Sequence, residues 1–122
     1  MNKFFQHART AALASPGVGR GEFRHGAVLV EKNRIVSSGF NLLKTHRLLA
    51  KSTPFPYIHA ETSCIIKYGL NNCRGLDLYV IRIGRLDDIR LSRPCSVCQE
   101  WIRGAGIRNV FFSISQHEYG VL

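Results

Sequence analysis

The sequence has 122 residues, of which 45% are hydrophobic and 20% are charged. This length corresponds to one domain, and this composition excludes a disordered or collagen-like chain. With 17 Lys and Arg residues against 8 Asp and Glu, the formal net charge is +9, which favours anionic partners such as phosphates or nucleic acid. No apolar run approaches the about 18 residues that cross a bilayer, so we expect a single domain over residues 1–122 and no membrane partner.

The N-terminal segment, residues 2–14, has apolar side chains at helical spacing from Phe4 onward, and Pro16 ends the predicted helix. Residues 11–15 resemble a signal-peptidase site. Polar residues interrupt the segment before them, however, so no apolar signal region forms. We therefore expect a cytoplasmic protein whose four cysteines are reduced.

Ala27–Val30 and Ile35–Phe40 are predicted strands, and the turn between them makes a hairpin. Residues 41–58 form a long irregular stretch, and loops of this length in small domains are often functional.

The rest of the chain alternates helices and strands. The predicted elements are a helix over His59–Tyr68, a strand over Leu76–Ile83, a loop over Gly84–Arg93, a helix that begins at Pro94 and a strand over Ile107–Ile114. The middle strand is nearly all apolar, which is typical of a central strand covered on both faces. The order predicts an α/β fold with a mixed sheet of four to five strands and helices on both faces.

Two of these helix starts carry side chains that bind metals. His59-Ala60-Glu61 opens one helix, and Pro94-Cys95 with Cys98 opens the next. We expect Pro94, Cys95 and Cys98 in the first helical turn, where the two cysteines share a face and thiolates are favoured. His59, Cys95 and Cys98 leave one tetrahedral position of a zinc ion open, which is typical of catalytic zinc rather than structural zinc.

Glu61 lies two residues after His59, where it can reach a water molecule on the metal without being a ligand. Zinc lowers the pKa of bound water to about 7, and a carboxylate can carry its proton to a ring nitrogen and then to a leaving amine. The spacing H-x-E followed by P-C-x-x-C is that of zinc-dependent deaminases. The sequence therefore predicts a Zn²⁺-dependent hydrolase with Glu61 as its catalytic residue.

The other two cysteines are rival candidates for a fourth ligand. Cys64 lies on the apolar stripe of its helix and is predicted to be a small buried hydrophobe, and Cys73 is predicted to be a free thiol in a turn. Taken alone, the C-x-x-C pair could be a redox pair, and the His and Glu could be structural.

With these motifs the sequence resembles the cytidine/deoxycytidylate deaminase superfamily from about Gly26 to Ser113. Residues 106–110 resemble the deoxycytidylate-type branch, and Gly39-Phe40-Asn41 resembles the strand end whose Asn contacts the substrate. The resemblance implies a three-layer fold, zinc on His59, Cys95 and Cys98, a proton shuttle on Glu61, and substrate contacts from Asn41 and the backbone N–H groups of Ala60 and Cys95. Because relatives form dimers or rings, it also implies a homo-oligomer.

Two features depart from the family. Only eight residues follow Ile114, too few for another helix and the usual last strand. We expect Glu118–Leu122 to form a short antiparallel edge strand or nothing regular. The loop between Asn41 and His59 also lacks the extra cysteines and histidines of a second zinc site.

Positive charge gathers in that loop. No acidic residue lies between Glu31 and Glu61, and the loop holds Lys44, Arg47 and Lys51. These three side chains are predicted to bind a phosphate at the pocket mouth; a solvated basic loop is the alternative. His25 and His117 are predicted to be ordinary surface or turn residues.

The preferred function is hydrolytic deamination of a cytosine nucleotide, dCMP-like, to the uracil nucleotide with release of ammonia. The first alternative is a cytosine or adenine deaminase acting on single-stranded DNA or RNA, because Phe40, Phe55 and Tyr57 flank the basic loop and could stack on bases. The alternative from another class is a non-catalytic, zinc-stabilised nucleic-acid-binding module. Base choice stays open, since it depends on the shape of the pocket.

Overall fold

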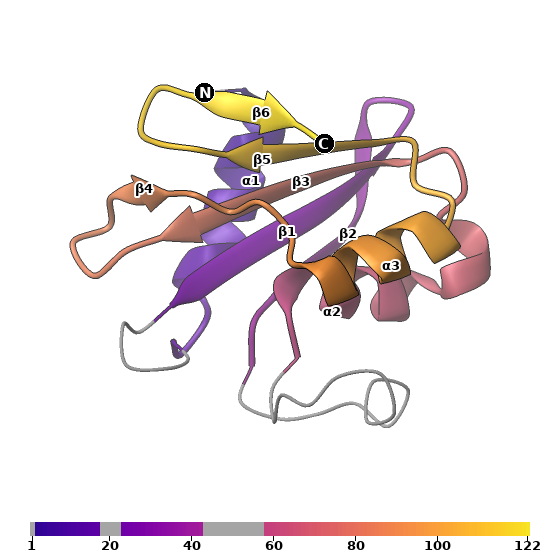
Figure 1. The fold of residues 1–122 in the computed structure, drawn as a ribbon, viewed down its shortest axis with the longest axis horizontal. Helices are drawn as coiled ribbons and strands as arrows, with labels where there is room; N and C mark the ends of the chain where they lie inside the picture. Colours follow the sequence, from indigo (N-terminus) through magenta and orange to yellow (C-terminus); the bar gives the residue numbers. More distant parts are fainter. Residues whose placement is uncertain (1, 18–22, 43–57) are drawn as a thin grey trace.

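The computed structural model describes residues 2–17, 23–42 and 58–122. A six-stranded sheet lies between one helix on one face and two helices on the other (Figure 1). Its elements are α1 (Lys3–Leu13), β1 (Arg24–Glu31), β2 (Arg34–Phe40), α2 (Ala60–Tyr68), the 3-10 turn η1 (Leu70–Asn72), β3 (Asp77–Ile83), β4 (Ile89–Arg90), α3 (Ser96–Gly104), β5 (Asn109–Ser113) and β6 (Tyr119–Val121). The predicted three-layer α/β architecture is confirmed.

The sheet has the strand order β2-β1-β3-β5-β6, and β4 pairs with the end of β3. β1 is antiparallel to both β2 and β3, whereas β3 and β5 are parallel, so the sheet is mixed. The antiparallel edge strand predicted at the C-terminus is confirmed as β6. The prediction of four to five strands missed β4, a two-residue strand whose length is too short to show any alternation of polar and apolar residues.

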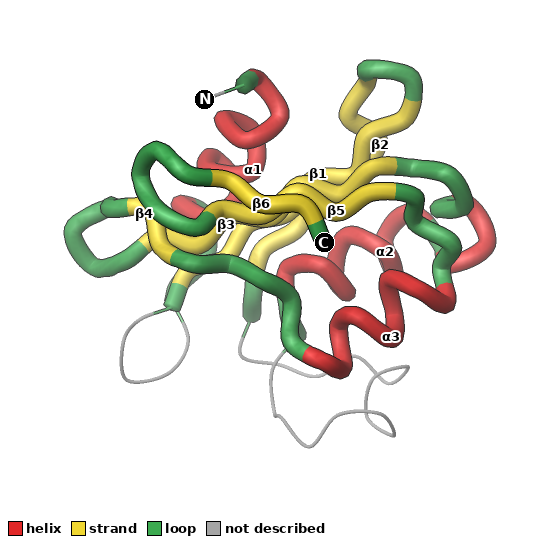
Figure 2. The backbone as a smooth tube through the Cα atoms, turned by 45° about the horizontal axis from the view of Figure 1, so that its top comes forward, coloured by secondary structure: helices red, strands yellow, loops and turns green. Residues whose placement is uncertain are grey.

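β1 and β3 alternate their side chains between two apolar clusters. Val28 and Tyr79 face α1, whereas Ala27, Leu78 and Val80 face α2 and α3. Both strands are therefore covered on both faces, and the predicted central strand over residues 76–83 is confirmed as β3. Figure 2 shows the helices on either side of the sheet.

Two glycines let the helices approach the hairpin closely. A Cβ atom on Gly26 would overlap the carbonyl oxygen of Ala8 in α1, and one on Gly39 would lie 3.0 Å from the carbonyl oxygen of Ala60 in α2. The backbone at the start of α2 is thus pressed against β2, which fixes the position of the residues around His59.

The helices that carry the metal-binding motifs begin one or two residues later than predicted. His59 and Cys95 are the N-cap residues of α2 and α3, both with extended backbone, and Pro94 lies before α3 rather than in its first turn. Neither N-cap side chain accepts a hydrogen bond from its own helix. The side chains of His59 and Cys95 instead approach each other, from the start of α2 and the start of α3.

The two remaining cysteines are buried in the cluster between the sheet and α2. Cys64 donates its thiol hydrogen to the carbonyl oxygen of Ala27 at 3.2 Å, and burial raises its pKa to about 12. Cys64 is therefore the buried thiol that was predicted. Cys73 is a free thiol as predicted, but it is fully buried rather than merely placed in a turn. Among the described helices, none is long and apolar enough to span a membrane.

Candidate metal centre and active site

The three predicted metal ligands meet where α2 and α3 begin, on one face of the sheet (Figures 1 and 2). The donor atoms of His59, Cys95 and Cys98 all lie within 4.8 Å of one another. Nδ1 of His59 lies 3.2 Å from Sγ of Cys98 and 3.8 Å from Sγ of Cys95. Strand β3 and the β4 segment separate the two helix starts in sequence, so only the fold brings the triad together.

These distances fit a tetrahedral zinc ion. Zn–S bonds of about 2.3 Å and Zn–N bonds of about 2.0–2.1 Å place neighbouring N and S ligands about 3.6 Å apart in a tetrahedron. The two N–S distances in the protein lie on either side of this value. One imidazole and two thiols also form a donor set that zinc prefers, so His59, Cys95 and Cys98 are positioned to bind Zn²⁺.

The electrostatics of the cysteine pair favour a cation. Hydrogen bonds from Cys98 and His59 lower the pKa of Cys95 to about 3, which makes it a thiolate. The neighbouring Cys95, together with burial, raises the pKa of Cys98. The two cysteines therefore cannot both be thiolates unless a positive charge lies beside them, and a divalent metal would supply that charge.

Glu61 lies in the first turn of α2 and is 4% exposed. Burial raises the pKa of its carboxyl group, and this outweighs the opposing charge of His59. The carboxyl group is also within hydrogen-bonding reach of Cys98. A buried carboxyl beside a metal triad, with its pKa shifted toward neutrality, is suited to accept and return protons.

Asn41 is buried at the end of β2, where its side chain joins three segments. Its Oδ1 accepts hydrogen bonds from the Ser15 hydroxyl at 2.8 Å and from the backbone N–H of His25 at 2.9 Å. Its Nδ2 donates to the backbone carbonyl oxygen of Phe23 at 2.7 Å. This anchoring role was not evident from the sequence. The predicted substrate contact of Asn41 stays a prediction.

The remaining predicted substrate-binding residues divide into two groups. Ala60 is fully buried at the start of α2, directly between His59 and Glu61. Lys44, Arg47 and Lys51 lie outside the described residues.

His25 is a residue near the metal centre that sequence reasoning missed, because it was predicted to be an ordinary surface or turn residue. It lies in β1, and burial, followed by the charges of Arg82 and His59, lowers its pKa to about 4. Since β1 begins at Arg24, its alternation puts His25 on the same face as Ala27 and therefore as α2. Extending the predicted strand back from Ala27 by one two-residue period places His25 on the same face as Ala27.

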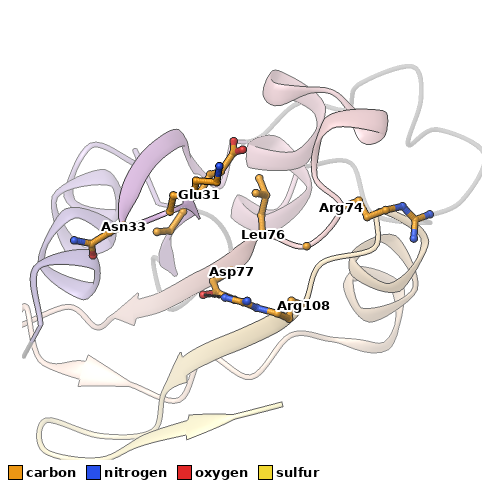
Figure 3. Close-up of a pocket in the computed structure, with 9 residues that line it drawn as sticks. Glu31, Asn33, Arg74, Leu76, Asp77 and Arg108 are labelled. Atoms are coloured by element: carbon orange, nitrogen blue, oxygen red, sulfur yellow. Dashed lines mark hydrogen bonds and ion pairs between the residues drawn. The ribbon is translucent and has the colours of Figure 1, made fainter.

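A separate pocket of about 420 Å³ lies at the other end of the sheet (Figure 3). It is lined by the β1–β2 turn and by Arg74, Asp77 and Arg108, and Arg108 pairs with Asp77 at 3.1 Å. The register sets this end apart from the metal centre, because Asp77 pairs with Val30 at one end of β1 and His25 lies at the other. This pocket does not contain the metal ligands.

Comparisons with solved structures agree with the fold. The chain superposes on a dCMP deaminase from the cyanophage S-TIM5 with a TM-score of 0.66 and 20% identity, covering 96% of this chain and 88% of the other. A cytidine deaminase from Burkholderia pseudomallei gives a TM-score of 0.71 and 17% identity over 100% and 92% of the two chains. A guanine deaminase from Bacillus subtilis gives 0.54 and 25% identity over 93% and 65%.

A search of curated protein sequences gave no significant match. The family model described as the cytidine and deoxycytidylate deaminase zinc-binding region matches residues 1–114. This match spans most of the sequence and includes all three ligands and Glu61. The chain therefore belongs to the cytidine and deoxycytidylate deaminase family.

Proposed function

We propose that this protein deaminates a cytosine nucleotide, dCMP-like, to the corresponding uracil nucleotide and releases ammonia. The observation that carries the proposal is the buried Glu61 carboxyl group beside the His59, Cys95 and Cys98 triad. The net charge of +9 supports a phosphate-bearing substrate. The S-TIM5 enzyme of similar fold is itself a dCMP deaminase.

In the proposed mechanism, the triad would hold zinc, which when bound acidifies a water molecule and polarises it for attack. Glu61 accepts one proton of the attacking water as its oxygen bonds to C4 of cytosine. Glu61 then delivers that proton to ring N3. A second proton passes through Glu61 to the C4 amine, which leaves as ammonia while C4 becomes a carbonyl carbon.

Substrate positioning is proposed for Asn41, for the backbone N–H groups of Ala60 and Cys95, and for the basic side chains of Lys44, Arg47 and Lys51. The basic residues follow Asn41 directly in sequence, and arginine and lysine pair well with phosphate. We also propose a cytoplasmic homo-oligomer. Free thiols that serve as metal ligands suit a reducing compartment, and this supports the location.

The test is ammonia release by the zinc-loaded protein from a panel of substrates: dCMP, CMP, deoxycytidine, cytosine, dAMP, guanine and a cytosine-containing single-stranded oligonucleotide. We expect the highest kcat/KM with dCMP. Release only from the oligonucleotide would favour the strand-acting alternative. No release from any substrate would favour a zinc-stabilised binding module.

Glu61→Gln is the first predicted variant, because glutamine keeps the size of the side chain but cannot carry a proton. We expect kcat to fall by about 10²- to 10⁴-fold, the usual contribution of general acid–base catalysis. Zinc content, measured by atomic absorption, should stay at the wild-type value because Glu61 is not a ligand. Unchanged turnover in this variant would contradict the mechanism.

A further inference from the structure

Arg82 lies near the end of β3, on the same face of the sheet as the metal centre. The β3 residues on this face are Leu78 and Val80, which pack toward α2, and Arg82 continues their row. Its antiparallel partner across the ladder is His25 in β1. Side chains of directly paired residues point to the same side of a sheet, so Arg82 and His25 face the metal centre together.

The guanidinium group of Arg82 is held by an aromatic ring and not by an acid. Its central carbon lies 4.1 Å from the centroid of the Phe23 ring. Its Nε atom is buried and has no hydrogen-bond partner in the described part of the chain. Nor does Arg82 form an ion pair there, because the neighbouring Asp87 and Asp88 pair with Arg24 and Arg90.

Among the residues that the structure describes, this arrangement leaves the charge of Arg82 partly desolvated and without a compensating acid. Burial and then the charge of Arg90 lower the pKa of Arg82. Arg90 is its cross-strand partner in β4, so two guanidinium groups lie on one side of the sheet end. Burying the polar atoms of a cation without a partner costs free energy, and an anionic ligand would remove that cost.

Contacts link Arg82 to the predicted active site through two residues. Phe23, against which it stacks, accepts a hydrogen bond from the Asn41 side chain. His25, its cross-strand partner, donates its backbone N–H to the same Asn41 side chain. The imidazole of His25 also lies close enough to His59 and Cys95 for their charges to act on it. A ligand at the metal centre that extends toward this end of β1 would meet the Arg82 guanidinium.

We propose that Arg82, held flat by Phe23 and flanked by His25, binds the phosphomonoester of the nucleotide substrate. This inference rests on the proposed function and names the phosphate-binding residue of the same site. A planar guanidinium matches two phosphate oxygens with parallel N–H groups, which a lysine cannot do. A monoester carries more negative charge than a phosphodiester, so a free nucleotide fits better than a strand.

The experiment measures binding and not turnover. Zinc-loaded Glu61→Gln protein is titrated by calorimetry with dCMP, with deoxycytidine and with a trinucleotide that has a central cytosine and no terminal phosphate. We expect dCMP to bind about 10- to 100-fold more tightly than deoxycytidine, the range for hydrogen bonds to a charged group. Adding Arg82→Gln should abolish most of this difference and leave deoxycytidine binding unchanged.

Two further variants serve as controls. Arg82→Lys keeps the positive charge but lacks the parallel N–H groups of the guanidinium, so it should restore only part of the preference for dCMP. Arg74→Gln removes the same charge from an exposed position at the far end of the sheet and should leave the preference intact. Circular dichroism and thermal melting of each variant show whether it is folded.

The outcomes separate this inference from the proposed function. Equal affinities for dCMP and deoxycytidine, no binding of either, or a preference that survives Arg82→Gln would overturn the phosphate assignment. If Arg82 strengthened the binding of the trinucleotide only, the bound group would not be a phosphomonoester. That result would favour a single-stranded nucleic acid as the ligand. Wild-type protein that binds dCMP through Arg82 but releases no ammonia would refute the deaminase and leave the phosphate site standing.

Discussion

At the scale of single residues, buried side chains combine chemical and structural roles. Glu61 is buried beside the metal-binding triad, and this burial raises its pKa, as the proposed proton transfer requires. Asn41 is equally buried, but its amide group satisfies polar groups of Ser15, Phe23 and His25. A buried amide with this many partners stabilises the local backbone, so Asn41 holds in place the strand ends around the metal centre.

Asn41→Ala tests this anchoring role. The substitution leaves the backbone N–H of His25 and the carbonyl oxygen of Phe23 without their side-chain partner, and each such group costs about 1–3 kcal/mol. The Ser15 hydroxyl keeps its hydrogen bond to the backbone carbonyl of residue 41. We expect the free energy of unfolding, measured by urea denaturation, to fall by about 2–4 kcal/mol, less than the simple sum because water enters the site. Asn71→Ala, at an exposed position of η1, is the control and should change it by under about 0.5 kcal/mol.

At the scale of elements, close backbone contacts place the helices on the sheet. α1 rests on β1 at Gly26, and α2 rests on β2 at Gly39. The start of α2 supplies His59 and Glu61, and the start of α3 supplies both cysteines. The geometry of the triad thus depends on how tightly α2 is seated against the hairpin.

Gly26→Ala should be strongly destabilising, because the new Cβ would overlap the carbonyl oxygen of Ala8 and force α1 away from β1. Overpacking of this kind costs about 1–3 kcal/mol, measurable as a lower midpoint of thermal unfolding. Gly104→Ala provides the comparison. A Cβ there meets nothing within 4 Å at the end of α3, so the midpoint should stay equal or rise. Similar losses in both variants would contradict the packing argument.

The elements were largely predictable from the sequence, and the exceptions have physical causes. Amphipathic spacing placed α1, apolar runs placed β1, β3 and β5, and the turn after β1 placed β2, because these patterns are local. β4 was missed because its two residues, Ile89 and Arg90, are too few to show the alternation of polar and apolar side chains that marks a strand. The helix starts were displaced because His59 and Cys95 use their side chains for each other and not for helix capping.

At the scale of the whole molecule, the metal centre joins two helices that are separated by β3 and β4 in sequence. The side chains of His59, Cys95 and Cys98 bring the starts of α2 and α3 together, although Cys95 and Ser96 lie at the surface. A bound zinc ion therefore acts as a cross-link between these helices. A ligand that binds the folded state but not the unfolded state raises the free energy of unfolding, and the increase grows with the logarithm of the ligand concentration.

Removal of zinc should lower thermal stability. At a thousandfold excess over its Kd, zinc adds about 4 kcal/mol, so a chelator should lower Tm by roughly 15 °C and added zinc should restore it. Cys98→Ser should abolish this response and the bound metal. Cys73→Ala, which changes a buried thiol outside the triad, should still bind one zinc ion per chain and respond to the chelator. Equal zinc content in both variants would exclude the assigned ligand set.

The sequence by itself singled out His59, Cys95, Cys98 and Glu61, the α/β order of the elements and the excess of positive charge, because each is a local pattern of residue types. Only the tertiary structure decided where His25, Asn41 and Arg82 lie relative to one another. Antiparallel pairing of β1 with β3 sets His25 opposite Arg82, and the end of β2 delivers Asn41 to both Phe23 and His25. Strand register joins residues far apart in the chain, and no spacing along the sequence encodes it.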